Sequence, residues 1–279
     1  MTSWIVDVTF DGDPSLEPAA IAKLLDNSWR DQFGDATVFG RDADSGRWTF
    51  LIAADGPNAV DRLKIGFDYV NLFDPDDDTS DPAIYQARLN DLPGRLTRFG
   101  RSTVTAAVSP QAAGCRAAEL RNLLGLEGLM TGLVLQAPAG LRYDGRTVWD
   151  VMLCLGMRWG DMDCFHWDNK SEFGNDYLLT VETSTPPGYF LPKWIAAGQL
   201  HVDDLVFHYS IPRSPSPVEV FDAMARAVQY AQSRLGGTIL DEHRRPADLE
   251  VIRRVVAQTE ARLRAEGFEP GSDAALRLF

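Results

Sequence analysis

This chain of 279 residues has few of the residues on which many enzymes and secreted proteins depend. It contains only three cysteines, Cys115, Cys154 and Cys164, and four histidines. No Cys-x-x-Cys pair and no Cys/His spacing typical of zinc occurs, so we expect reduced, partly buried thiols in a cytoplasmic protein. The Gly-x-Ser-x-Gly, phosphate-loop and Rossmann glycine patterns are also missing. The sequence therefore predicts a non-enzymatic protein without a metal or cofactor.

Basic residues are scarce as well. Lys and Arg number 27 against 40 Asp and Glu, for a formal net charge of −13. Nucleic acids and anionic lipids are bound through clustered positive charge, so both are unexpected partners. The residues from Met1 to Asp7 do not resemble a signal peptide, and no apolar run is long enough to cross a bilayer. We expect a protein or peptide partner, away from membranes.

Apolar residues make up 45% of the chain, which is enough for an ordinary core. In the first half, alternation predicts strands at 4–10 and 102–108 and a hairpin of 36–39 with 48–52. Helical spacing of apolar residues covers 21–29, 83–98 and 111–124, and we also expect a helix over 60–73. The second half follows a similar order. Strands are expected at 132–136, 163–167, 177–182, 205–211 and 238–240, and helices at 148–159, 217–235 and 249–263, the second of them capped by Ser216.

A short pattern occurs once in each half. Phe33-Gly34-Asp35 and Trp159-Gly160-Asp161 are each followed four residues later by a phenylalanine. Each copy follows a helical pattern and precedes two strand-like runs. The repeat predicts two related modules, residues 1–125 and 130–267, followed by a tail at 268–279. The fold class expected is α+β, with each module a mostly antiparallel sheet that has helices on one face.

Three stretches of the second half resemble a known family. They are 158–166 (RWGDMDCFH), 185–190 (TPPGYF) and 231–245 (AQSRLGGTILDEHRR). Together they are similar to the C-terminal, FtsZ-binding domain family of the cell-division protein ZipA, over roughly residues 132–267. The first half resembles it only through the internal repeat. The resemblance implies that each module is a split β-α-β unit and that the role is non-enzymatic. It also implies a binding module whose open sheet face receives the C-terminal tail of FtsZ in a shallow apolar groove.

The expected groove of this chain is more polar than that of the family. Alternation places Thr180, Glu182 and Ser184 on one face of their strand, and Val206, His208 and Ser210 on one face of the next. Burying such groups unpaired opposes the binding of an apolar segment. The candidate partner-binding residues are Met162, Cys164, His166, Glu182, Val206 and His208. Besides FtsZ binding, the acidic charge leaves open a toxin-neutralising immunity protein that reuses the fold.

Three further groups contain side chains that could serve catalysis, metal binding or ion pairing. Asp161 and Asp163, two apart in the expected strand, form an acid–base or metal pair only if both carboxylates share a site. His166, His208 and Cys164 form a metal cluster only with a fourth ligand, for which no spacing is evident. The run Asp241 to Arg245 is expected to be an ion-pair corner. We also expect Gly160 to require a positive φ between helix and strand.

Overall fold

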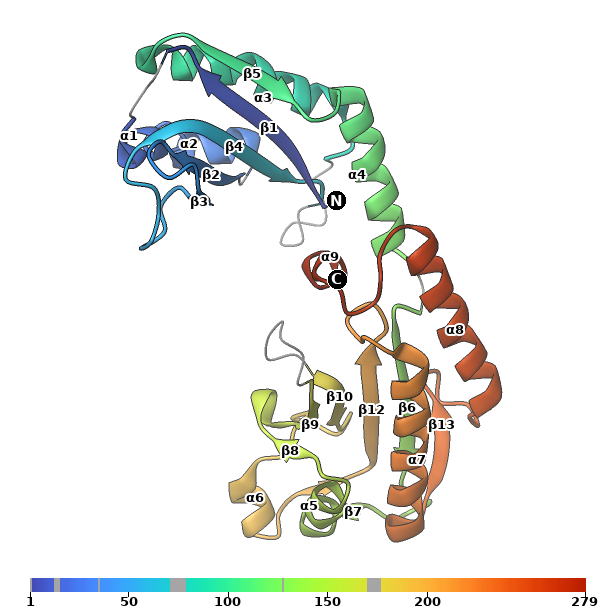
Figure 1. Ribbon diagram of the computed structural model, residues 1–279. Coiled ribbons are helices and arrows are strands. Elements are labelled where there is room, and N and C mark those ends of the chain that lie inside the picture. Colours follow the sequence, from blue (N-terminus) through green and yellow to red (C-terminus); the bar gives the residue numbers. More distant parts are fainter. Residues whose placement is uncertain (1, 13–15, 35, 71–78, 127, 170–176) are drawn as a thin grey trace. The chain divides into compact units, whose positions relative to one another are not determined.

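The computed structural model describes residues 2–12, 16–34, 36–70, 79–126, 128–169 and 177–279. The chain divides into two compact units, Met1–Gly125 and a second that begins at Leu126 (Figure 1). The first unit contains β1 (Ser3–Phe10), α1 (Pro18–Ala22), α2 (Asn27–Phe33), β2 (Ala36–Asp42), β3 (Trp48–Phe50), β4 (Val60–Asp68), α3 (Pro82–Leu96), η1 (Thr97–Phe99), β5 (Ser102–Ala106) and α4 (Pro110–Leu124).

The second unit contains β6 (Met130–Gln136), β7 (Tyr143–Asp144), α5 (Gly145–Cys154), β8 (Arg158–Trp159), η2 (Asp161–Asp163), β9 (Phe165–Asp168), β10 (Tyr177–Glu182), α6 (Pro192–Ala196), β11 (His201–Val202), β12 (Asp204–Ser210), α7 (Pro217–Leu235), β13 (Thr238–Asp241) and α8 (Leu249–Ala265). The chain ends with α9 (Asp273–Leu278). The structure is thus α+β with antiparallel sheets, in agreement with the fold class expected from the sequence.

The first sheet has the strand order β3-β2-β4-β1-β5, and every pairing in it is antiparallel. Alternate residues of β1 are buried, from Trp4 to Phe10, so one face of the sheet forms the core of this unit. Trp4 packs edge-on against Tyr85 of α3, with ring centroids 5.0 Å apart. The helical stripe expected at 21–29 is divided, because Asp26 caps α2 by accepting a hydrogen bond from the Trp29 amide.

The expected helix over 60–73 is wrong in its first nine residues, which form β4, the strand between β1 and β2. Leu63, Ile65 and Phe67 face the core while Arg62 and Lys64 are exposed. The apolar residues at 60 and 63 imitate a helical spacing, but the alternation from 62 to 67 is that of a strand with one buried face. Residues 71–78 lie outside the described part of the chain.

The second sheet has the order β13-β6-β12-β10-β9-β8, again antiparallel throughout, and β11 and β7 form a separate two-stranded ladder. Helix α7 covers one face of this sheet with a buried stripe that includes Phe221, Met224 and Val228 (Figure 1). Opposite that stripe, β12 and β6 bury Phe207 and Leu133. The expected cap of α7 is not formed, since the Ser216 side chain accepts no capping hydrogen bond.

Both units contain a split β-α-β element, but they differ in the rest of the sheet. In the first unit, α3 connects β4 to β5, the two strands that flank β1. In the second unit, α7 connects β12 to β13, the two strands that flank β6. The strand that follows Gly34 pairs directly with β4, whereas the strand that follows Gly160 is separated from β12 by β10. Asp35 lies outside the described residues. The origin of the two units by duplication stays a prediction.

Candidate functional site

One face of the second sheet is not covered by α7, and we call it the second open face. Strand register defines its residues. One row across the strands contains His166, Thr180, His208 and Gly132, and the next contains Glu182, Val206, Val134 and Leu240. Four of the six predicted partner-binding residues, His166, Glu182, Val206 and His208, therefore share this face. Whether they contact a partner stays a prediction.

His166 is buried and has both ring nitrogens engaged. Its Nε2 lies 2.9 Å from the carbonyl oxygen of Asp161, and its Nδ1 lies 3.0 Å from the hydroxyl of Thr180. Because a carbonyl only accepts, Nε2 carries a proton and donates to it, while Nδ1 shares a hydrogen bond with the Thr180 hydroxyl. The imidazole also stacks on Tyr177, at a centroid distance of 3.8 Å. His166 thus joins β9, β10 and the η2 turn, with no ring nitrogen left for a ligand.

The residues before His166 form a turn, not the strand expected there. Asp161 and Asp163 lie in η2, where Met162 and Asp163 have φ of 53° and 55°. The expectation that Asp161 and Asp163 share one face of a strand is therefore wrong, and the acid–base pair that depended on it loses its basis. Gly160 has a φ of −169°, so the expected positive φ is wrong as well, and the left-handed residues follow it. Met162 is 76% exposed at the tip of the turn.

Cys164 has the properties of a structural thiol. It is buried, and its Sγ donates to the carbonyl of Met162 at 3.3 Å. Burial, aided by the nearby carboxylates of Glu182, Asp163 and Asp161, raises the pKa of Cys164 to about 11. The thiol is therefore protonated near neutral pH and a weak ligand. Within the described ranges, no three His, Cys, Asp or Glu side chains are grouped closely enough to hold a metal ion.

The centre of the second open face is formed by Glu182, Val206 and His208. The His208 Nε2 lies 3.8 Å from a Glu182 carboxylate oxygen, too far for a hydrogen bond, and has no hydrogen-bond partner among the described residues. Burial lowers the pKa of His208, against the opposing attraction of Glu182. Since Glu182 remains 45% exposed, the face presents a carboxylate, an imidazole and a valine side by side. This arrangement suits a ligand that brings both apolar and hydrogen-bonding groups.

A second polar cluster, which the sequence pattern did not predict, closes one end of this face. Asp204 has no exposed surface, and its carboxylate accepts hydrogen bonds from Thr183 and from the Ser184 hydroxyl and amide. Arg244, at a φ of 62°, lies 2.6 Å from the same carboxylate. Its guanidinium also donates to Gln136 and Ser184. The turn after β13, in which Arg244 has a left-handed backbone conformation, brings this arginine over β12.

The predicted ion-pair corner at 241–245 is present in part. Arg245 pairs with Asp241 at 2.9 Å, and the Asp241 carboxylate accepts from the amides of His243 and Arg245. Arg244 departs from that corner to reach Asp204. In the sequence, the signal for the Asp204 cluster is the pair Asp203-Asp204 directly before an apolar strand. This pair does not show that Arg244 is the partner.

The comparisons with known proteins concern the second unit. Residues 129–258 match the family model described as "ZipA, C-terminal FtsZ-binding domain". The protein named "Cell division protein ZipA" from Pseudomonas fluorescens (strain Pf0-1) is 25% identical over 118 residues. That match covers 42% of this chain and 40% of the Pseudomonas protein, so the chain spans less than half of that relative. Among the helices of the described ranges, none has the length and apolar character needed to cross a membrane.

The matched residues contain every strand of the second open face together with α7 and β13. The resemblance seen at 158–166, 185–190 and 231–245 is thereby confirmed for this part of the chain. Residues 129–258 of this chain are thus similar to the ZipA C-terminal, FtsZ-binding domain family.

Proposed function

We propose that the second unit is a non-enzymatic, protein-binding module of bacterial cell division, and that its second open face binds a segment of FtsZ. The observation that carries the proposal is the family match over 129–258, which spans all the strands of that face. The printed name of the Pseudomonas relative supports the same role. The cytoplasmic location stays a prediction from the sequence.

The chemistry of the face supports a ligand that is not purely apolar. Val206 supplies an apolar contact, while Glu182 and His208 beside it offer a carboxylate and a buried nitrogen without a partner. An apolar side chain placed over them would keep both polar groups unpaired and removed from water, which costs about 1–3 kcal/mol for a neutral group. We therefore propose that binding is strongest for a segment that carries a hydrogen-bond donor or a cation next to its apolar residue.

A toxin-neutralising immunity protein is the second candidate function. The supporting observation is the net charge of −13, which would complement the basic surface of a nuclease-like toxin. Such a partner would associate faster at low salt and would not require Val206. The salt dependence of the association rate therefore separates the two functions.

We expect a peptide with the FtsZ C-terminal tail to bind the full chain, and Val206→Asp to weaken this binding by at least about tenfold. The aspartate would place a second carboxylate beside Glu182, across the strand pair. His208→Ala and Glu182→Ala should change the affinity by smaller factors, by removing a polar partner. Isothermal titration calorimetry measures the affinity of the peptide for the wild type and for each of these three variants.

The matched control is Val251→Asp. It puts the same charge on a half-exposed valine of α8, outside the second open face. If the wild type and all variants of the second open face bind the peptide with equal affinity, the peptide does not bind at this face. No binding of the tail peptide at all would reject FtsZ as the ligand.

A further inference from the structure

The first unit also has a sheet face that its helices do not cover, and this face carries exposed aromatic side chains. We call it the first open face. By strand register, one row contains Ile5, Gly66 and Thr37, the next Asp7, Lys64, Phe39 and Phe50, and the third Thr9, Arg62, Arg41 and Trp48. The opposite face carries the buried core residues such as Trp4, Leu63 and Ile65.

Aromatic side chains are concentrated at the β2–β3 edge of this face. Phe50 is 55% exposed and Trp48 is 38% exposed. The Phe50 ring stacks on Phe39, with centroids 4.6 Å apart. The Lys64 ammonium lies over the Trp48 ring, 5.4 Å from its centroid. Exposed aromatic groups of this kind are unusual on a free surface and are the residues most often central to protein contacts.

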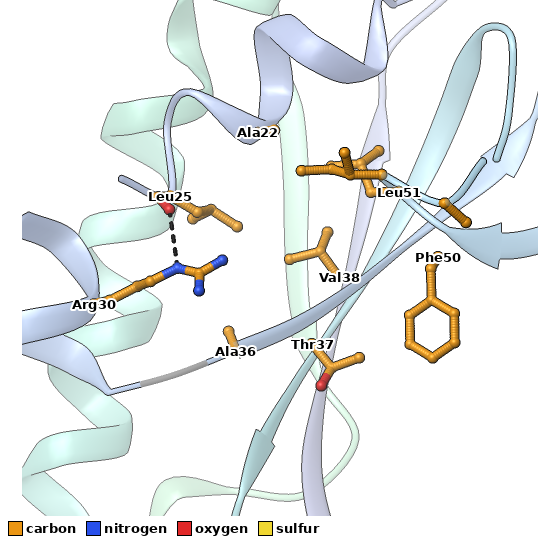
Figure 2. Close-up of a pocket in the computed structure, with 10 residues that line it drawn as sticks. Ala22, Leu25, Arg30, Ala36, Thr37, Val38, Phe50 and Leu51 are labelled. Atoms are coloured by element: carbon orange, nitrogen blue, oxygen red, sulfur yellow. Dashed lines mark hydrogen bonds between the residues drawn. The ribbon is translucent and has the colours of Figure 1, made fainter. Parts of the chain in front are cut away.

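A pocket of about 460 Å³ continues this edge toward the helices of the unit. Thr37 and Phe50 line it and also belong to the first open face. Figure 2 shows Leu25, Val38 and Leu51 around the pocket, with the Phe50 ring directed away from Leu51. Among the lining residues that the structure describes, Arg30 alone is charged, and its Nε donates to the Leu25 carbonyl at 3.3 Å. The pocket has the size and lining to hold one large apolar side chain.

The backbone next to this pocket favours an extended occupant. On the side of β2 away from β4, β3 pairs with Phe39–Arg41, and the Leu51 amide donates to Val38. Ala36 and Thr37 thus have no strand partner on that side within the described residues. A short strand added there would direct alternate side chains to the pocket and to the first open face.

The charge of the first open face favours an acidic occupant. Arg62 and Lys64 are exposed in neighbouring rows of it, whereas Arg41, in the same row as Arg62, is already paired with Asp61. The carboxylate nearest to Lys64 is Asp7 at 3.5 Å, and both side chains of this pair are almost half exposed. Such a pair contributes little by itself and leaves the ammonium available. This is a cationic area on a chain of strongly negative net charge.

Gly66 forms a shallow depression between Ile5 and Thr37. A Cβ at this position would lie 3.3 Å from the Ile5 Cδ1 and 3.7 Å from the Thr37 carbonyl oxygen. The contact is with the flexible end of a side chain, so a larger residue can be accommodated and would fill the depression from the open side. This makes Gly66 a position at which the face can be blocked without removing a core residue.

We propose that the first open face is a second binding site of this chain, and that it takes an extended protein segment that carries both apolar residues and Asp or Glu. An apolar side chain enters the pocket beside Val38, the neighbouring apolar residues lie on Phe39, Phe50 and Trp48, and carboxylates pair with Lys64 and Arg62. This site is independent of the function proposed for the second unit.

The test is a selection of phage-displayed random peptides on the full chain, followed by fluorescence anisotropy of the selected peptides. We expect sequences that combine apolar residues with Asp or Glu. Phe50→Ser and Gly66→Leu should each weaken their binding by at least about tenfold. Lys64→Glu should weaken it strongly at low salt and less at high salt, because an exposed charge pair is screened.

Matched controls use the same substitutions in the second unit. Leu153→Ser removes a side chain that is 52% exposed, and Lys193→Glu reverses an exposed lysine of α6. Val206→Asp must leave these peptides unaffected, so that failure of FtsZ binding and failure of this site are seen separately. Circular dichroism confirms that each variant is folded.

Three results would overturn the proposal. The first is a selection that yields no peptide sensitive to Phe50→Ser and Gly66→Leu. The second is a set of face-dependent peptides that is basic or lacks Asp and Glu. The third is a dimer, detected by light scattering and abolished by Phe50→Ser, since a second copy of the chain would then be the occupant.

Discussion

Replacing Asp204 by alanine is expected to destabilise the second unit by about 3 kcal/mol or more. The carboxylate is fully buried at the start of β12 and holds Thr183, Ser184 and Arg244 together. Its loss leaves the Thr183 hydroxyl and the Ser184 amide and hydroxyl without their acceptor, at about 1–3 kcal/mol for each buried group left unpaired. Urea unfolding, with amide exchange of peptides from β10 and β12, reports this unit separately from the first.

Asp203 provides the matched control, because it precedes Asp204 in the chain and also pairs with an arginine. Its carboxylate lies 2.7 Å from Arg142, but both side chains are about half exposed. Asp203→Ala should therefore change the unfolding free energy far less than Asp204→Ala. Equal effects of the two substitutions would show that the Asp204 cluster does not stabilise the second unit.

The same cluster predicts a pH dependence. Burial opposes ionisation of Asp204, but hydrogen bonds from Ser184, Arg244 and Thr183 outweigh it and lower the pKa of this carboxyl. A carboxyl whose pKa is lower in the folded state stabilises the fold above its unfolded pKa of about 3.9, and this contribution is lost as pH falls further. The stability difference between the wild type and Asp204→Ala should therefore shrink between about pH 5 and about pH 2.

Gly237→Ala is expected to lower stability by at least about 2 kcal/mol. Gly237 follows α7 with a φ of 97°, and a Cβ there would lie 2.2 Å from both the Gln136 carbonyl oxygen and the Tyr143 hydroxyl. The first is backbone of the central strand β6, so β13 would have to move away from it. That movement would also displace the turn that carries Arg244. Thermal and urea unfolding measure the loss.

Gly236→Ala separates the clash from the cost of a left-handed residue. Gly236 has a φ of 75°, and a Cβ there would meet only Pro138 at 3.7 Å. This variant should lose about 1 kcal/mol, from backbone conformation alone. If Gly237→Ala costs no more than Gly236→Ala, the close approach of Gly237 to β6 is not what requires this glycine.

Much of the candidate site could be predicted from local sequence. The alternation of 205–211 places Val206 and His208 on one face, and that of 177–182 does the same for Thr180 and Glu182, as observed in the register. The structural role of His166 as a link between β9, β10 and the η2 turn could not be predicted, because its hydrogen-bond partners depend on where the η2 turn brings the Asp161 carbonyl. The sequence pattern predicts a strand for Asp161 and Asp163. The observed turn depends on two left-handed residues, Met162 and Asp163, for which the sequence has no reliable signal.

The sequence by itself determined the class of fold, the order of most helices and strands, and the resemblance of the second unit to the ZipA C-terminal domain family. These depend on periodic burial and on short-range patterns such as the Leu-Gly-Gly end of α7, which each segment carries in its own residues. Tertiary structure decided what depends on neighbours distant in the chain. It made 60–68 a strand, because the segment lies between β1 and β2, and it placed Arg244 on Asp204. It also brought Trp48, Phe50 and Lys64 together on one face, because strand register, not spacing along the chain, sets which side chains are adjacent.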